Sequence, residues 1–172
     1  MVKLKGRVIH MEIERKYQIK QIPEDLSQYS FKVIEQGYLC HNPTIRIRKS
    51  NEDYILTYKS KISSKNKEGA PNINNEVELP LTEEAYYKLK EKTEGNIVHK
   101  IRYLIPLESG LTVELDVFND KLKGLIFAEV EFPDEDSAYD FIAPDWFGKE
   151  LSMDKRFSNY YLSKLSGIED LL

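Results

Sequence analysis

The sequence of 172 residues has a single cysteine, no long apolar run and no excess of positive charge. One cysteine, Cys40, excludes an internal disulfide and is typical of a protein in a reducing cytoplasm, where we expect this one to act. No apolar stretch approaches about 18 residues, so no membrane-spanning helix is expected. Lys3, Lys5 and Arg7 interrupt the first ten residues, which argues against a signal peptide.

The formal net charge is −4, so the surface as a whole gives no reason to expect binding to nucleic acid or to an anionic membrane. The positive charges do not form one basic run, and any anion site must therefore be assembled in space. A chain of this length is expected to form one domain. We assign residues 11–172 to that domain and residues 1–10 to an N-terminal extension, because Met11 begins the patterned region.

What the sequence does contain is charge repeated at every second position. Glu12, Glu14 and Lys16 are two residues apart, and such residues share one face of a strand. That face would carry two carboxylates and an ammonium group, with Ile13 on the opposite face. The same spacing returns in Arg46/Arg48, Glu76/Glu78, Lys100/Arg102, Glu114/Asp116 and Glu129/Glu131, with Lys59 on a strand of its own.

These sets fall on predicted strands that are mostly joined by hairpins. Strands are expected at 13–20, 31–39, 44–50, 54–61, 75–80, 97–107, 111–118 and 125–132, helices at 82–92, 136–141 and 157–165, and a mobile loop at 62–75. Hairpins favour an antiparallel sheet, and about eight strands can close around a small ligand. The predicted fold is α+β, mainly β: a closed eight-stranded antiparallel barrel with a few flanking helices.

Each charged face could point to solvent or into the barrel. For a single strand, solvent is the ordinary interpretation. Most of these sets are of one sign, however, whereas an ordinary surface mixes signs and uses neutral polar residues as well. We therefore predict that the charges line the lumen and that helices cover an apolar outer face. An apolar outer face also makes a homodimer an expectation.

A charged lumen requires ligands, because like carboxylates repel one another and buried charge must be paired. The surplus acidic pairs can hold Mg²⁺ or Mn²⁺, which prefer oxygen ligands. Arginine pairs can bind phosphate oxygens through bidentate hydrogen bonds. Carboxylates, divalent metal and basic side chains recur together in phosphoryl transfer. The residues alone thus predict a pocket for a polyanion and a divalent metal.

Taken in order, these motifs resemble the CYTH superfamily, the triphosphate tunnel metalloenzymes. The resemblance rests on Glu12-x-Glu14-x-Lys16, on the later charged pairs and on the segment from Asp154 to Asn159, and it extends to about Leu165. It implies an eight-stranded tunnel that binds a small-molecule triphosphate. The basic residues implied to bind the phosphates are Lys16, Arg46, Arg48, Lys59, Lys100 and Arg102, with Lys155 or Arg156 as a further contact.

The resemblance also implies the acidic residues and the reaction. The implied metal ligands are Glu12, Glu14, Glu129 and Glu131, with Glu114 and Asp116 close by, while Glu76 and Glu78 support the lumen. The implied catalytic residues are Lys16 or Lys100, to neutralise or protonate the leaving group, and Glu129 and Glu131, to orient or activate water.

The expected reaction is metal-dependent hydrolysis of a terminal phosphoanhydride in inorganic tripolyphosphate or a nucleoside triphosphate, giving phosphate and the diphosphate product. Two alternatives stay open: a class IV-type adenylyl cyclase, and a module that binds triphosphate or polyphosphate without turnover. The presence of every acidic pair favours an enzyme over a binding module.

Overall fold

The computed structural model describes residues 2–4, 7–23, 25–62 and 69–171. The strands are β1 (Val2–Leu4), β2 (Arg7–Ile19), β3 (Ser30–Cys40), β4 (Thr44–Ser50), β5 (Asp53–Lys61), β6 (Asn72–Pro80), β7 (Glu94–Pro106), β8 (Thr112–Phe118), β9 (Ile126–Glu131) and β10 (Phe147–Glu150). The helices are α1 (Glu83–Lys90), α2 (Glu135–Asp140) and α3 (Asn159–Leu162), with short 3₁₀ turns at Leu26–Gln28, Asp120–Leu122, Lys155–Phe157 and Ile168–Leu171.

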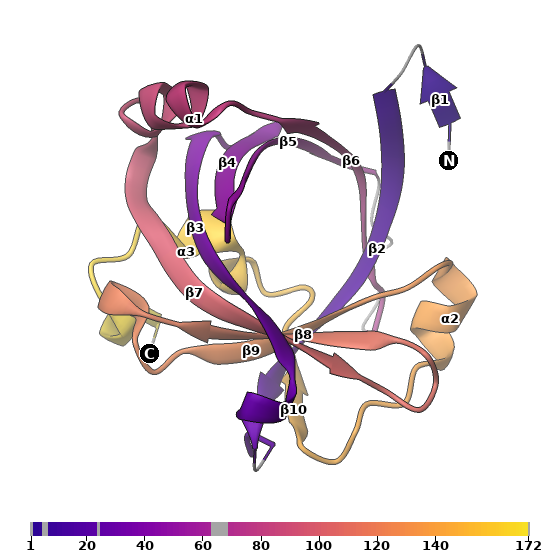
Figure 1. Cartoon of the computed structure of the whole chain (residues 1–172). Helices are drawn as coiled ribbons and strands as arrows, with labels where there is room; N and C mark the ends of the chain where they lie inside the picture. Colours follow the sequence, from indigo (N-terminus) through magenta and orange to yellow (C-terminus); the bar gives the residue numbers. More distant parts are fainter. Residues whose placement is uncertain (1, 5–6, 24, 63–68, 172) are drawn as a thin grey trace.

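Eight of the strands form a closed antiparallel barrel, seen as a ring in Figure 1. Their order is β2-β6-β5-β4-β3-β7-β8-β9, and β9 returns to pair with β2. This confirms the predicted barrel. β1 and β10 pair with β2 outside the ring. The boundary drawn after residue 10 falls inside β2, which begins at Arg7 and pairs His10 with Glu76 of β6.

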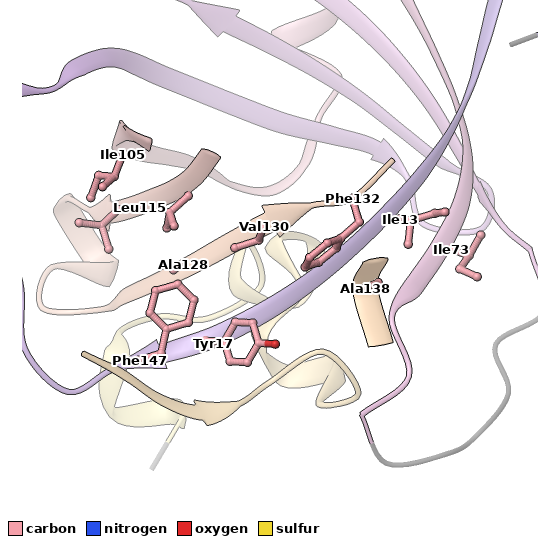
Figure 2. Close-up of a cluster of buried hydrophobic side chains, with 11 residues drawn as sticks. Ile13, Tyr17, Ile73, Ile105, Leu115, Ala128, Val130, Phe132, Ala138 and Phe147 are labelled. Carbon is pink, nitrogen blue, oxygen red and sulfur yellow. The ribbon is translucent and has the colours of Figure 1, made fainter. Parts of the chain in front are cut away.

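A hydrophobic core covers the outside of the barrel at β2, β8 and β9. Ile13, Leu115 and Val130 alternate with the charged residues, are fully buried there, and pack against Ala138 of α2 and Phe147 of β10 (Figure 2). The side chain of every second residue points away from the lumen, so one strand can serve a charged interior and an apolar exterior.

Helix α1 covers another part of the outer face. It begins after Thr82, whose side chain accepts a hydrogen bond from the amide of Ala85, and it lies against β4 and β5 with Tyr86 fully buried. Helices therefore cover the apolar exterior in part. Phe31 and Val33 of β3 are 54 % and 53 % exposed, and Tyr58 of β5 is 44 % exposed.

Two predicted segments differ from the structure, and one strand within residues 11–172 was not predicted. Residues 72–75 belong to β6 rather than to a loop, because Ile73 enters the outer core while Asn72 and Asn74 face the other way; residues 63–68 of that loop lie outside the described residues. β10 was missed, since a four-residue strand has almost no periodicity. The expected helix at 157–165 contracts to the short α3.

The C-terminal segment closes one end of the barrel. Val98, Phe118 and Phe127 have the same inward alternation as the charged residues of β7, β8 and β9, but they are buried against Leu151 and Leu162. In Figure 1, α3 lies across the ring at this end. We call this layer the floor of the lumen. No helix in the described part of the chain is long and apolar enough to cross a membrane.

Candidate active site

The charged sets meet inside the barrel. Lys59 of β5 pairs with Glu12 and lies 3.6 Å from Glu14, both on β2, although β6 separates the two strands. Arg102 of β7 likewise reaches Glu129 of β9 at 2.7 Å across β8. Side chains of strands that are not neighbours converge on the concave side of a closed sheet. These ion pairs therefore lie in the lumen, as predicted.

One side of the lumen, which we call the acidic wall, consists of Glu12, Glu14, Lys59 and Glu76. A single ammonium group faces three carboxylates here, since Lys59 Nζ also lies 3.8 Å from Glu76. Burial and the nearby charge of Glu12 raise the pKa of Glu14 to about 7, and burial also raises the pKa of Glu12 in spite of Lys59. Within the described chain, Glu76 Oε2 is buried without a hydrogen-bond partner. The Arg46 guanidinium of β4 also lies 4.0 Å from Glu76, but the three carboxylates still carry more negative charge than Lys59 and Arg46 neutralise.

The opposite side, which we call the paired wall, consists of Lys100, Arg102 and Asp116. Lys100 Nζ lies 2.5 Å from Asp116, and Arg102 donates to both oxygens of the same carboxylate at 2.7 Å. Burial alone would raise the pKa of Asp116, but Arg102 and Lys100 outweigh it and lower that pKa. Arg102 also pairs with Glu114 at the edge of this wall. Carboxylates and cations are matched here.

Lys16 lies at the floor between the two walls. Its Nζ is 2.9 Å from Glu129 and donates to the backbone oxygen of Phe157 at 2.8 Å, and it lies 4.5 Å from the Phe127 ring centroid. Burial would lower the pKa of Lys16, but Glu129 and Glu14 more than offset it and raise that pKa. Lys16 therefore stays charged, and the charges of Lys16 and Arg102 hold the pKa of Glu129 well below its usual range despite burial.

Lys100 differs from Lys16 in its charge balance. It is completely buried, 5.3 Å from the Phe118 ring centroid, and its Nζ lies 3.4 Å from Asn159 Oδ1 of α3. Burial lowers the pKa of Lys100 to about 8, with Arg102 adding to the effect and Asp116 opposing it. Of the two lysines, Lys100 gives up its proton more readily near neutral pH.

Two arginines of β4 have N–H donors that form no hydrogen bond within the described structure. In the described structure, the Nε atoms of Arg46 and Arg48 are buried without a partner. Arg46 does donate to Thr57 at 3.0 Å and lies 3.7 Å from Glu78. Burial, together with Arg46 and Arg102, lowers the pKa of Arg48 to about 10. A buried cation with free donors favours an anionic ligand.

Several predicted residues lie toward the open rim. Glu131 is opposite Glu14 in the β2–β9 register, and its side chain is half exposed and 3.4 Å from His10. Burial raises the pKa of Glu131. Glu78 and Glu114 are also partly exposed, at the edges of the two walls.

The structure does not bring Arg156 into the lumen. Its guanidinium forks onto Asp154, with a shortest distance of 2.7 Å, and it lines an outer hollow of about 310 Å³ beside Lys149. Lys155, in the same 3₁₀ turn, is exposed. A carboxylate two residues earlier holds the Arg156 side chain in this structure. A phosphate contact from Lys155 or Arg156 stays a prediction.

Neutral polar residues complete the lumen and were not predicted. Asn74 donates to Glu12 at 3.1 Å, and Asn159 reaches Lys100 from the C-terminal segment. Asn72 and Asn74 continue the spacing of Glu76 and Glu78 backwards along β6, so the alternation could have revealed them. Asn159 is the first residue of α3, where strand alternation gives no signal, although it ends the Asp154–Asn159 segment on which the family resemblance rests.

The carboxylates of the acidic wall are of the type that binds a hard divalent cation. Among the described residues, no group of three or more acidic, histidine or cysteine side chains is arranged to hold a metal, because Lys59 Nζ lies between the carboxylates of the acidic wall. The chemistry nonetheless fits: Glu12 and Glu14 are oxygen ligands with raised pKa values, and Glu76 has a buried oxygen without a partner. A cation would offset the excess charge of this wall.

Two curated proteins that are similar to this chain are both inorganic triphosphatases. A scan against protein-family models finds no match. The chain is 36 % identical over 156 residues to an inorganic triphosphatase of Nitrosomonas europaea, covering 88 % of this chain and 96 % of that protein. It is 34 % identical over 131 residues to an inorganic triphosphatase of Acetivibrio thermocellus, covering 75 % and 78 %.

Solved structures agree. The crystal structure of the inorganic triphosphatase NE1496 matches with a TM-score of 0.63 and 32 % identity over 95 % of each chain. An adenylyl cyclase-like protein from Hippeastrum, described as having a dominant triphosphatase activity, matches with a TM-score of 0.56 at 17 % identity over 73 % of this chain and 81 % of that one, which shows the shared fold alone. The chain therefore belongs to the family of these inorganic triphosphatases, within the CYTH or triphosphate tunnel superfamily.

Proposed function

We propose that this protein hydrolyses inorganic tripolyphosphate to phosphate and diphosphate with the help of Mg²⁺ or Mn²⁺. One observation carries the proposal: in the described part of the chain, a closed lumen holds two arginines with buried, unpartnered Nε atoms beside carboxylates whose pKa values are raised. The first group favours a polyanion, and the second favours a cation. The names of the relatives support the same reaction.

The basic side chains would bind the phosphates. Arg46 and Arg48 offer Nε donors that have no partner among the described residues, and these suit phosphate oxygens in bidentate geometry. Lys16 and Lys100 extend the positive charge to the floor, and Lys59 and Arg102 extend it to the two walls. The floor would exclude water from the deep end of the lumen.

The acidic wall would hold the metal. Glu12 and Glu14 would be its central ligands, with Glu131 opposite Glu14 in the register and Glu129 next along β9. Asp116 is better suited to ion pairing, because Lys100 and Arg102 already surround it. When bound, the metal would neutralise charge on the phosphate oxygens and offer an acidic water.

The protein side chains would move the protons. Lys100, with a pKa of about 8, can protonate the leaving phosphate oxygen from Nζ more readily than Lys16, whose pKa is raised. Glu131, whose pKa is raised, is better suited to accept a proton from the attacking water than Glu129, which Lys16 and Arg102 keep ionised. Water oxygen bonds to the terminal phosphorus as the bridging P–O bond breaks.

No observation favours the cyclase alternative over hydrolysis, since the cyclase-like structure supports only the fold and is itself described as having a dominant triphosphatase activity. The free Cys40 is in keeping with action in a reducing cytoplasm. The homodimer stays a prediction, for which the exposed Phe31 and Val33 offer an apolar surface.

The test is phosphate release from tripolyphosphate with Mg²⁺, Mn²⁺ or chelator, beside ATP and thiamine triphosphate, with cyclic AMP measured in the ATP sample. We expect metal-dependent release that is fastest from tripolyphosphate. Cyclic AMP with pyrophosphate would instead indicate a cyclase, and tight binding without turnover would indicate a binding module.

A further inference from the structure

Along one edge of β2, the hydrogen-bonding partner changes at Lys16. β6 pairs with β2 only as far as Asn72, opposite Glu14, so β6 offers no backbone partner to Lys16 on this edge. The C-terminal segment takes its place: the amide of Leu151 donates to the Lys16 oxygen at 2.7 Å, and the Lys16 amide donates to Ser152 Oγ at 2.9 Å. A side-chain hydroxyl thus replaces a backbone carbonyl at a lumen lysine.

The hydroxyl of Ser152 is itself held in place. Ser152 is buried, and its Oγ donates to Glu150 Oε1 at 2.7 Å. Arg15 Nε and Nη2 donate to the two oxygens of Glu150 at 2.9 and 2.7 Å. The backbone oxygen of Ser152 accepts a hydrogen bond from the Asn72 side chain at 2.7 Å. This chain of bonds seals the seam between β6 and β10.

The same segment holds the other end of Lys16. Phe157, five residues after Ser152, accepts a hydrogen bond from Lys16 Nζ at 2.8 Å. The backbone amide, backbone oxygen and ammonium group of Lys16 are therefore all bonded to the C-terminal segment. A loss of the Ser152 hydroxyl would leave the buried Lys16 amide without its acceptor and free the strand at this point.

We propose that Ser152, oriented by Glu150 and Arg15, is a positioning residue for Lys16 and, through it, for the phosphate that Lys16 binds. The inference rests on the proposed function in one respect, namely that Lys16 binds phosphate. Ser152 makes no contact with the substrate in this scheme, so its effect must act through Lys16.

A double-mutant cycle tests this. The affinity for tripolyphosphate is measured by calorimetry in chelator, so that neither turnover nor metal is needed, for the native protein, Ser152→Ala, Lys16→Met and the double variant. We expect Ser152→Ala to weaken binding about tenfold in the native protein and less than about twofold in the Lys16→Met background. Ser152→Thr keeps the hydroxyl and should bind within about twofold of the native protein.

Ser163→Ala is the matched control. Ser163 is also fully buried, and its hydroxyl donates to the backbone of Tyr160, away from Lys16. Its effect should be the same in both backgrounds. An equal loss for Ser152→Ala in both backgrounds, or no loss at all, would overturn the proposal. If Ser152→Ala does not fold, Glu150→Gln replaces it in the cycle, because it weakens the orientation of Ser152 without removing the hydroxyl.

A substrate-free readout separates this inference from the proposed function. The ¹⁵N signals of the Lys16 amide and ammonium group should shift in Ser152→Ala and stay unchanged in Ser163→Ala. If native protein binds tripolyphosphate neither in chelator nor with Mg²⁺, the proposed function fails while these signals still test positioning. Unchanged Lys16 signals in Ser152→Ala would overturn the positioning role by themselves.

Discussion

The two walls of the lumen contain similar residues but differ in their charge balance. In the acidic wall, Lys59 is shared by Glu12, Glu14 and Glu76, and burial raises the pKa of Glu14 to about 7. In the paired wall, Asp116 is shared by Lys100 and Arg102, and its pKa is lowered. The two walls therefore differ in the number of cations per carboxylate rather than in residue type. The acidic wall favours binding of a cation, whereas the charges of the paired wall already neutralise one another.

This difference has an energetic meaning. A buried ion pair whose members are matched and hydrogen-bonded is costly to break, since removing one partner leaves a buried charge. A group of carboxylates with too few cations instead gains from losing a charge or from binding a metal. We therefore expect changes in the paired wall to affect stability first and changes in the acidic wall to affect metal binding first.

The largest effect on stability is expected in the paired wall. Asp116→Asn removes the shared partner of Lys100 and Arg102, so the free energy of unfolding should fall by about 3–5 kcal/mol. Urea unfolding measures this. Glu94→Gln, which breaks an exposed pair with Lys164, is the control and should cost at most about 1 kcal/mol. Equal losses in the two variants would remove the distinction between the walls.

In the acidic wall, the largest effect should be on activity. Glu14→Gln keeps the size of the side chain but removes the charge that the metal would need, so Mg²⁺-dependent phosphate release should fall at least about 100-fold. Stability without metal should stay the same or rise, since repulsion from Glu12 is relieved. Activity close to that of the native protein would show that Glu14 is not a ligand.

The pH dependence of stability should follow the acidic wall. The folded-state pKa of Glu14 is raised above its unfolded value, so the stabilisation from its neutral form is present below pH 4.5 and is lost as the pH rises through about 7. Between pH 5 and 8 the metal-free protein should lose about 2 kcal/mol relative to Glu14→Gln. Urea unfolding at both pH values, in chelator, gives the difference. If the stability difference between the native protein and Glu14→Gln does not change with pH, Glu14 is not the group whose pKa is raised.

Asp116 should act in the opposite direction. Because its folded-state pKa is lowered, it contributes stability above its unfolded pKa, which is lost as the pH falls through the lowered value.

In the same wall, Lys100 has a pKa lowered to about 8. Its charge is therefore lost on going from pH 7 to pH 9, and affinity for tripolyphosphate should weaken about threefold to tenfold. Calorimetry in chelator measures this, and Lys100→Arg should flatten the profile because arginine stays charged.

The smallest effect is expected outside both walls. Arg156→Ala should change kcat/KM for tripolyphosphate by less than about twofold, because its guanidinium is held by Asp154 at the outer surface. Arg48→Ala is the matched comparison from the lumen and should cost far more. A large loss for Arg156→Ala would restore it to the substrate site.

The sequence predicted the barrel and the inward charges because alternation carries that information directly. Glu12, Glu14 and Lys16 share one face in any strand, and only a closed sheet gives such a face a common interior. Alternation cannot predict pairing: nothing in the local sequence distinguishes Glu14, which shares one lysine with two other carboxylates, from Asp116, which pairs with two cations. Ser152 was missed for a related reason, since it lies in an irregular segment and acts across 136 residues of chain.

Divalent-metal binding distinguishes the acidic wall from the paired wall. Mn²⁺ is titrated into the metal-free native protein, Glu14→Gln and Asp116→Asn, and free Mn²⁺ is followed by electron paramagnetic resonance. If the acidic wall binds the metal and the paired wall does not, Glu14→Gln loses Mn²⁺ binding, whereas folded Asp116→Asn keeps it. Native affinity in Glu14→Gln together with loss in Asp116→Asn would contradict the account and place the metal on the paired wall.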